Sequence, residues 1–394
     1  RTYPQNEPNP VQQKTYSFEE QEHKFVAKVL GDQILQDTQI KTLEGSKRMF
    51  HYSNGVYLDN GKDKIQSLCA DFLQDHYCNH YFNETLGYIQ AKTFIDPDEI
   101  NNDWINLENG LLNPKTKEFK GHTPDVFSTI RVPIKFDSQA DCPIFKQKLS
   151  EKLDSKTIEV VQEMFGYCYM SGQLFEVAFL FYGPFRTMKS TTLKVLGKIL
   201  GNENVSAYAL QYLTEDRFGP AYLYGIPANI CADLSSKALG NTAFFMQVTG
   251  QDKISCARKN EHPISFCPST KLIYSCNQIP PTSNKNLAFY RRWIILDFNK
   301  HTAIEDVDPH LLEKFEAELP GILNWSLEGL DRLLAQKKFS YWLDEKQVKD
   351  LYEKGSDSIQ SFIYNKIDTE DDEGALTKRE VYANYKDYCK QEGM

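Results

Sequence analysis

One segment of the sequence has the residue types and the order of a loop that binds the phosphates of a nucleoside triphosphate. Residues 179–196 read FLFYGPFRTMKSTTLKVL, an apolar run followed by a turn and then by helical spacing. A buried strand, such a turn and the next helix direct backbone N–H groups toward an anion. Lys189 would contact the β- and γ-phosphates, and the hydroxyl of Ser190 would bind Mg²⁺. The residues predicted to surround the nucleotide are Gly183, Pro184, Phe185, Arg186, Thr187, Met188, Lys189, Ser190 and Thr191.

The loop departs at two positions from the usual pattern GxxxxGK[ST]. Met188 replaces the second glycine, and Phe185 stands where small residues are common. Glycine is used in such loops because a backbone without a Cβ can approach a phosphate closely. We therefore expect weakened, but not absent, nucleotide binding. The alternative interpretation is an ordinary strand–turn–helix unit with a basic first turn.

Two other predicted strands end in polar residues that could serve the same site. The run IPANICAD ends in Asp233, and the run STKLIYSCN ends in Asn277. Ligands of open parallel sheets bind outside the carboxyl ends of the strands, so these two side chains and Lys189 are expected to converge. Asp233 would hold Mg²⁺ and polarise water, although a lone Asp at a strand end is also a common turn or capping residue. Which residue activates the water stays open.

The strands that carry these residues are short apolar runs, which is typical of strands covered on both faces of a parallel sheet. They alternate with helical segments, so the sequence predicts an α/β fold with a parallel-sheet core. The expected domains are a linker at 1–15, a mixed α/β N-terminal domain at 16–138, a helical segment at 139–174, the core at 175–300, a helical extension at 301–337 and a small C-terminal domain at 338–394.

Composition and charge exclude several classes of protein. The chain has 394 residues, of which 41% are hydrophobic and 25% charged, as in globular rather than disordered proteins. The net charge of −9 means that nucleic-acid binding would need a local basic patch. No apolar stretch approaches the roughly 18 residues of a membrane-spanning helix, so no membrane partner is expected. Nine cysteines without a CxxC pair favour reduced thiols and the cytoplasm, of a prokaryote or of a host cell if the protein is viral.

The order of the motifs resembles that of the superfamily 3 helicases, specifically the phage and plasmid primase-associated group with an AAA+ ATPase core. FLFYGPFRTMKSTTL is similar to the Walker A region of this family, and PANICADLSS is similar to its Walker B region. STKLIYSCNQIPP resembles its sensor motif, and AFYRRWIILDF resembles its arginine-finger segment. FFMQVTGQDKISCARKNEHPISF is similar to its central motif and DNA-contacting hairpin.

The resemblance implies a homo-oligomeric ring, expected to be a hexamer, that hydrolyses ATP with Mg²⁺ between subunits. It implies translocation on single-stranded DNA, expected 3′ to 5′, in plasmid or viral replication. A primase domain is expected in the same chain or as a partner. Because the chain begins with Arg and ends with Met, we expect a fragment, with a truncated winged helix as one candidate for its C-terminal domain. The residues assigned to catalysis by the resemblance are Lys189, Asp233, Asn277, and Arg291 or Arg292.

The segment ISCARKNEHPISF predicts a hairpin with Arg258, Lys259 and His262 at or near its tip. One basic hairpin is usually solvated surface, but six copies in a ring would bring about twelve positive charges to one channel. Two other functions stay open. One is a nucleotide-binding ring that hydrolyses poorly and organises a replication complex, and the other is a small-molecule phosphotransferase. An arginine finger acting between subunits argues against the phosphotransferase.

Overall fold

In the computed structural model, the protein divides into two compact units. The described residues are 25–96, 103–258, 261–367 and 376–391. The first unit comprises Arg1–Ser53 and Leu58–Ile100, and the second comprises Asn54–Tyr57 and Asn101–Met394. The predicted linker at 1–15 lies outside the described residues.

The first unit packs helices against a small sheet. Strand β1 pairs antiparallel with β2 and parallel with β4. Ile34, Ile65 and Ile89 are fully buried and form the centre of the apolar core between the helices. Its elements are α1 (Ala27–Asp37), β1 (Ile40–Leu43), β2 (Met49–Ser53), α2 (Gly61–Leu73), η1 (Gln74–His76), α3 (Asn79–Thr93) and β4 (Phe94–Ile95). Strand β3 (Val56–Leu58) is divided between the two units.

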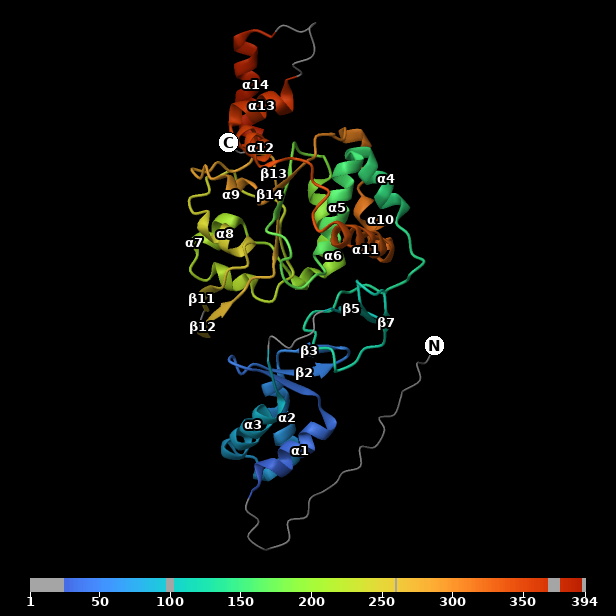
Figure 1. The fold of residues 1–394 in the computed structure, drawn as a ribbon, viewed down its shortest axis with the longest axis vertical. Helices are drawn as coiled ribbons and strands as arrows, with labels where there is room; N and C mark the ends of the chain where they lie inside the picture. Colours follow the sequence, from blue (N-terminus) through green and yellow to red (C-terminus); the bar gives the residue numbers. More distant parts are fainter. Residues whose placement is uncertain (1–24, 97–102, 259–260, 368–375, 392–394) are drawn as a thin grey trace, which may run out of the picture. The chain divides into compact units, whose positions relative to one another are not determined.

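A parallel sheet of five strands forms the centre of the second unit (Figure 1). Its strand order is β14-β8-β13-β10-β9, and every neighbouring pair is parallel. Strands β8, β10 and β13 are buried along their whole length, as expected for strands covered on both faces of a parallel sheet. The α/β fold predicted from the sequence is therefore confirmed. The strands are β8 (Ala178–Tyr182), β9 (Val205–Ser206), β10 (Ala228–Cys231), β13 (Lys271–Cys276) and β14 (Trp293–Asp297).

Helices cover both faces of this sheet. Helices α4, α5, α6, α10 and α11 pack on one face, around Phe145, Phe165 and Trp325 (Figure 1). Helices α7, α8, α9 and α12 cover the other face, around Phe245 and Trp293. The bounds are α4 (Pro143–Lys152), α5 (Ser155–Tyr167), α6 (Lys189–Leu200), α7 (Leu210–Glu215), α8 (Ala243–Thr249), α9 (Leu287–Tyr290), α10 (Leu311–Ala317), α11 (Leu319–Gln336) and α12 (Glu345–Ser356).

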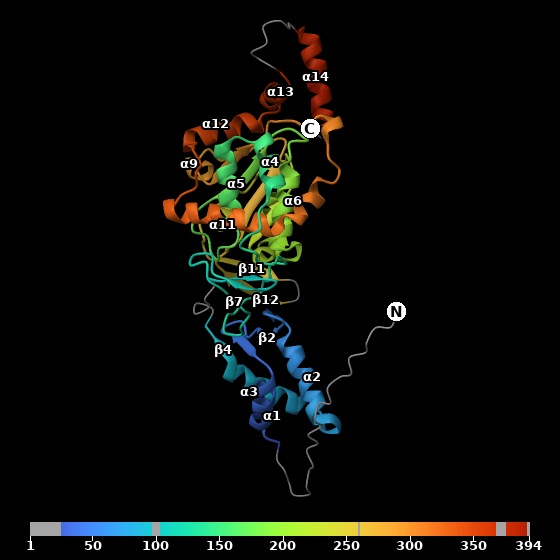
Figure 2. The ribbon, with the colours of Figure 1, turned by 90° about the vertical axis from the view of Figure 1, so that its right-hand side faces the viewer.

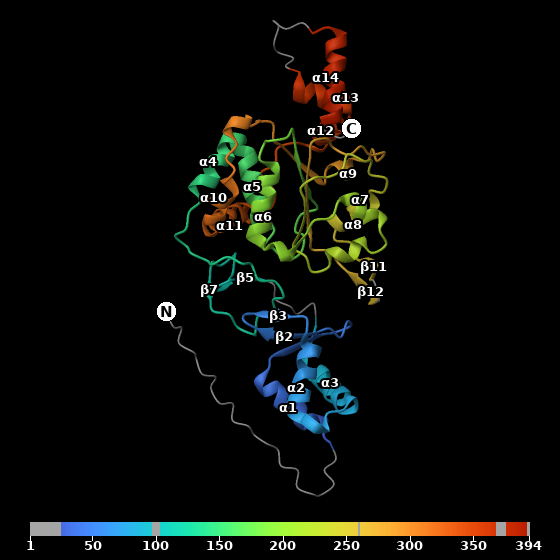
Figure 3. The ribbon, with the colours of Figure 1, turned by 180° about the vertical axis from the view of Figure 1, so that it is seen from behind.

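Several smaller elements complete the second unit. The predicted hairpin is present as the antiparallel pair β11 and β12 (Figure 3). Phe362 of α13 contacts Tyr385 and Tyr388 of α14. Within the described ranges, no helix is long and apolar enough to cross a bilayer. The bounds are β5 (Ile105–Leu107), β6 (Gly110–Leu112), β7 (Phe119–Lys120), η3 (Asn202–Asn204), η4 (Gly219–Leu223), β11 (Ile254–Arg258), β12 (Glu261–Phe266), η5 (Ile304–Asp306), α13 (Ser358–Lys366) and α14 (Lys378–Gln391).

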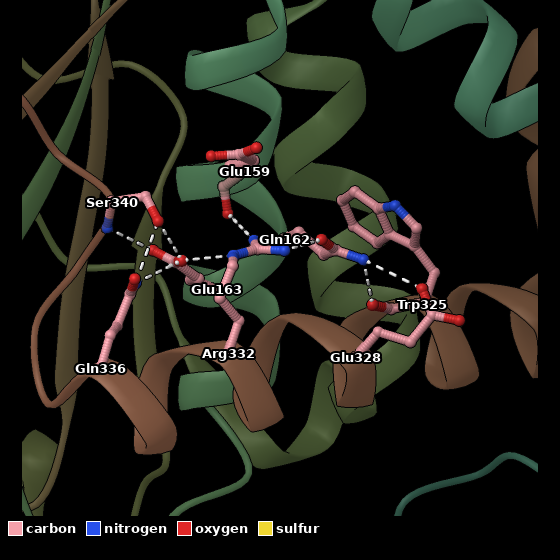
Figure 4. A network of polar contacts seen from close by, with 8 residues as sticks. All are labelled: Glu159, Gln162, Glu163, Trp325, Glu328, Arg332, Gln336 and Ser340. Carbon is pink, nitrogen blue, oxygen red and sulfur yellow. Dashed lines mark hydrogen bonds and ion pairs between the residues drawn. The ribbon is translucent and has the colours of Figure 1, made fainter.

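A buried polar network fastens α11 where it crosses α5 (Figures 2 and 4). The carboxylate of Glu163 is fully buried and accepts hydrogen bonds from Arg332 Nε at 2.7 Å and Gln336 Nε2 at 2.9 Å. The backbone and hydroxyl of Ser340 also donate to it. The helices approach so closely at Gly329 that a Cβ there would lie 2.5 Å from the backbone oxygen of Gln162. Because its hydrogen bonds are satisfied, this buried carboxylate stabilises the packing of α11 against α5.

The edge of the sheet at β14 is capped by a side chain. The hydroxyl of Tyr341 accepts from the backbone N–H of Ile295 at 3.1 Å and donates to its carbonyl at 3.0 Å. A phenol thus replaces the neighbouring strand that this edge lacks. The strand that follows the arginine pair is held on both sides, by β8 and by this residue.

Candidate functional site

The predicted phosphate loop is a strained turn between β8 and α6. Strand β8 ends at Tyr182, and α6 begins at Lys189. Gly183 has a φ of +143°, and a Cβ there would lie 2.3 Å from the carbonyl oxygen of Phe298. Met188 precedes the helix with a φ of +70°, in the left-handed region that glycine adopts readily. The backbone therefore has the conformation that the missing glycine would favour.

Lys189 is buried in this turn, with 6% of its surface exposed. Its ammonium donates to the carbonyl oxygens of Gly183 at 2.6 Å and Pro184 at 2.5 Å. It also donates to Oδ1 of Asn277 at 3.0 Å, which joins two segments that are 88 residues apart. The ammonium thus lies between its own loop and the end of β13.

The three strands that precede Lys189, Asn277 and Asp233 are neighbours, because β13 lies between β8 and β10. Asp233 is exposed beyond the end of β10. Burial raises the pKa of the Cys276 thiol, while Lys189 lowers it and Asp233 raises it. Because β8, β13 and β10 are parallel, Lys189 after β8 and Asp233 after β10 lie at the same end of the sheet.

The first turn of α6 offers a hydroxyl group to solvent. Ser190 is exposed, whereas Thr187 is buried and donates to Pro184 O at 2.9 Å. A hydroxyl and a carboxylate are oxygen ligands of the kind that Mg²⁺ prefers. Ser190 and Asp233 therefore have suitable chemistry for a magnesium site.

A cavity of about 660 Å³ adjoins the phosphate loop. Arg186, Met188 and Thr191 line it from the loop and α6, and His301 and Leu311 line it from the segment after β14. Its volume lies in the range of small-molecule sites. The cavity lets a ligand reach beyond the loop on the side of Met188.

Two residues near the loop were not predicted from the sequence. Lys366 of α13 places Nζ 5.3 Å from the ring centroid of Phe185. Asp297 ends β14 opposite Tyr182, at the same end of the sheet as the loop. The apolar run WIIL before an Asp gave a signal for Asp297, whereas helical spacing alone gave none for Lys366.

The arginine pair separates into an exposed and a buried member. The Arg291 side chain is 50% exposed, and that of Arg292 is 9% exposed. Both contact Glu176, Arg292 at 3.0 Å and Arg291 at 3.4 Å, and Arg292 also donates to Ala288 O at 2.8 Å. Burial lowers the pKa of Arg292, and Glu176 opposes this shift. Arg291 is therefore the solvent-accessible member of the pair.

The basic hairpin is described only in part. Arg258 lies with its guanidinium carbon 5.3 Å from the ring centroid of Tyr224. Lys259 lies outside the described residues, and so does the side chain of His262. The predicted DNA contacts of these three residues stay predictions.

Comparisons with known proteins give two family matches. The family described as "D5 N terminal like" matches residues 11–154, and a family of unknown function, DUF5906, matches residues 181–292. No curated protein matches the sequence. Such domains are typical of phage and plasmid primase-helicase proteins.

Solved structures of the NrS-1 C-terminal region have a similar fold. Its A-form apo structure is 14% identical, with a TM-score of 0.57, and the match covers 86% of this chain and 76% of that chain. The apo structure of NrS-1 residues 305–718 is 13% identical, with a TM-score of 0.54, and the match covers 92% and 86%. The family matches point to a replication protein of the primase-helicase type. The solved structures show a similar fold.

Proposed function

We propose that this chain is the ATP-driven motor of a replicative DNA helicase, with an AAA+ core of superfamily 3. The observation that carries the proposal is the hydrogen bond of 3.0 Å between Lys189 and Asn277 at the carboxyl end of the sheet. A cation from a phosphate loop and an amide from a neighbouring strand suit a γ-phosphate and its attacking water. The adjoining cavity gives room for a nucleoside.

Each residue of the site has a distinct role in this proposal. The backbone N–H groups of the loop and the Lys189 ammonium would bind the phosphates. Ser190 and Asp233 would hold Mg²⁺, which neutralises charge on the phosphates when it is bound. Asn277 would orient the water against the γ-phosphate. Asp233 and Asp297 are the two candidates to accept the proton of that water.

The arginine at the opposite end of the sheet requires a second subunit. Arg291 precedes β14, and that strand of five residues spans about 16 Å between Arg291 and the loop end of the sheet. Arg291 therefore cannot reach the nucleotide of its own subunit. In a ring it would face the phosphates of the neighbour and stabilise the charge of the transition state. A hexamer that moves 3′ to 5′ on single-stranded DNA, gripped by Arg258, Lys259 and His262, completes the proposal.

Two features favour the alternative function, a nucleotide-binding ring that hydrolyses poorly. The ammonium of Lys189 donates to acceptors in its own loop, and a phosphate must replace them. Met188 adds a side chain where nucleotide loops have none. Both features weaken binding or slow turnover, and they would suit a ring that organises a replication complex.

Steady-state ATP hydrolysis, measured with and without single-stranded DNA, tests the proposal. We expect turnover that single-stranded DNA stimulates and that Lys189→Ala abolishes. Lys198→Ala on the same helix is the matched control, because the Lys198 ammonium forms an ion pair with Glu316 at the surface. ATP binding without turnover in the wild type would favour the alternative function. Turnover that survives Lys189→Ala would contradict the assignment of this loop.

A further inference from the structure

Three tyrosines form an aromatic cluster on the surface of the second unit. The rings of Tyr208 and Tyr222 stack with centroids 4.4 Å apart and planes inclined by 22°. Those of Tyr208 and Tyr212 stack at 5.3 Å and 14°. Tyr212 and Tyr222 are each about 40% exposed. Two of the three clustered rings are therefore partly exposed to solvent, and we call these three residues the tyrosine platform.

The platform is held by buried polar groups. Its members come from the loop after β9, from α7 and from η4. Asn229, fully buried in β10, accepts from the backbone N–H of Tyr208 at 2.9 Å and donates to its carbonyl at 2.9 Å. Gln211 of α7 donates to the carbonyls of Ser235 and Lys237. Because the buried Asn229 amide bonds both backbone groups of Tyr208, it fixes the position of that residue.

The platform lies beside the basic hairpin. The 3-10 turn that carries Tyr222 contacts β11, the first strand of the hairpin. Tyr224, two residues later, packs edge-on against Phe266 of β12 with centroids 5.0 Å apart. The guanidinium carbon of Arg258 lies 5.3 Å from the centroid of the same Tyr224 ring. The segment that carries Tyr222 and Tyr224 thus connects the tyrosine platform to the cation of Arg258.

We propose that Tyr208, Tyr212 and Tyr222 stack the bases of single-stranded DNA while the hairpin contacts its phosphates. Every base has a π-face, so an aromatic platform binds a strand without reading its sequence, as a translocating motor requires. This inference rests on the proposed function, which it extends with a base-binding surface.

The charge at the rim of the platform favours bases over phosphates. A hydrogen bond to Asp216 raises the pKa of Tyr212 to about 12, so the phenol stays neutral and lies against a carboxylate. Asp216 and the neighbouring Glu215 would repel a phosphate placed on the tyrosines. The backbone of a bound strand would therefore run on the side of Arg258, with its bases turned toward the rings.

The test compares binding of oligo(dT) with binding of an abasic strand of the same length. The abasic strand keeps the phosphates and lacks the bases, so it reports the hairpin alone. In the variant Tyr212→Ala/Tyr222→Ala we expect affinity for oligo(dT) to fall by about tenfold or more, with affinity for the abasic strand unchanged. The variant Tyr212→Phe/Tyr222→Phe keeps the faces and should bind oligo(dT) within about threefold of the wild type. Tyr382→Ala, at a residue 61% exposed on α14, is the control.

Three outcomes would overturn the stacking proposal. They are normal binding of oligo(dT) by the double alanine variant, an equal loss for both strands, and a wild type that binds both strands equally. A variant that loses ring assembly, measured by particle mass, but keeps its preference for oligo(dT) would make the platform a subunit interface. Hydrolysis of ATP without DNA should be unchanged in all these variants. If the wild type does not hydrolyse ATP but the platform variants lose affinity for oligo(dT), the proposed motor function is contradicted and the stacking proposal is supported.

Discussion

A lysine is buried at each end of the parallel sheet. Comparing the two shows what distinguishes a ligand-binding lysine from one that stabilises the fold. Lys189 follows β8 at the carboxyl end and is 6% exposed, whereas Lys271 begins β13 at the amino end and is 1% exposed. Lys189 donates to Gly183 O, Pro184 O and Asn277. Lys271 donates to the carbonyls of Met170, Gly172 and Ser269.

The two lysines differ in what a ligand could replace. The partners of Lys189 belong to a turn with left-handed residues next to a cavity, so phosphate oxygens can take over from carbonyls. Lys271 is closed in by the ring of Tyr167, with Nζ 4.9 Å from its centroid. Its partners come from the segments before β8 and β13, which it ties together. A buried charge alone therefore does not indicate a ligand-binding site. Its position in the sheet determines whether a ligand can replace its partners.

The largest expected effect concerns the arginine pair at the amino end. Arg291→Ala should lower ATP turnover by about 10³-fold while ATP binding is kept, because a finger acts on the charge of the transition state. Arg292→Ala should instead lower the free energy of unfolding, since Glu176 and Ala288 O lose a buried partner. ATP turnover and thermal unfolding, measured for both variants, test these two effects.

Mixed rings provide the control for action between subunits. Arg291→Ala and Lys189→Ala chains, each inactive alone, should regain part of the turnover when mixed, because some interfaces combine an intact loop with an intact arginine. Full turnover of Arg291→Ala alone would show that the two ends of the sheet do not meet in a ring.

Replacing the lysine at the amino end should affect stability and not nucleotide binding. Lys271→Met leaves three buried carbonyls without their donor, so we expect the free energy of unfolding to fall by about 3 kcal/mol. Nucleotide affinity should stay within about twofold of the wild type, because Lys271 lies at the far end of β13. Denaturant unfolding and a nucleotide titration measure the two quantities. A large loss of affinity with unchanged stability would reverse the roles of the two ends.

The pH dependence of stability sharpens this assignment. Burial lowers the pKa of Lys271 from 10.5 to about 8, so between these values the unfolded chain binds more protons than the folded one. Stability contributed by this residue therefore rises with pH, by about 2 kcal/mol between roughly pH 7.5 and 9.5. The measurement is the difference between wild type and Lys271→Met, in which the other titrating groups cancel. A difference that is flat or falls over this range would contradict the burial of a charged ammonium.

The sequence predicted the sheet and its carboxyl end because both depend on local signals. Short, mainly apolar runs indicated β8, β10 and β13, and Asp233 and Asn277, which follow β10 and β13, lie at the same end of the sheet as the loop after β8. The hydrogen bond between Lys189 and Asn277 is found where that argument expects convergence, although the roles of both residues stay predictions.

The sequence could not show features that depend on several elements at once. Lys271 resembles an ordinary polar residue at the start of a strand, because two of its three carbonyl partners come from the distant segment before β8. The tyrosine platform was not predicted, since its rings meet only when η4, α7 and the loop after β9 pack together. The choice between Arg291 and Arg292 depends on which of the two adjacent side chains is buried before β14, and the sequence of the pair does not show this in advance.

The smallest expected effect tests the altered residue of the phosphate loop. Met188 holds a φ of +70°, which costs a residue with a Cβ about 1 kcal/mol, and its side chain lines the cavity and packs against the core. Met188→Gly removes the strain in the free and bound states alike, so relief of strain alone would not change affinity. Removal of the side chain does change it, because the phosphates can then approach the backbone. We expect nucleotide affinity to rise by about fivefold, measured by titration with a fluorescent nucleotide. Lys337→Gly is the control, since Lys337 has a φ of +55° at the end of α11 and should alter only stability. Affinity that is unchanged or lower in Met188→Gly would mean that the methionine supports the bound nucleotide, and the carboxyl end of the sheet would then differ from a glycine-built phosphate loop in mechanism as well as in sequence.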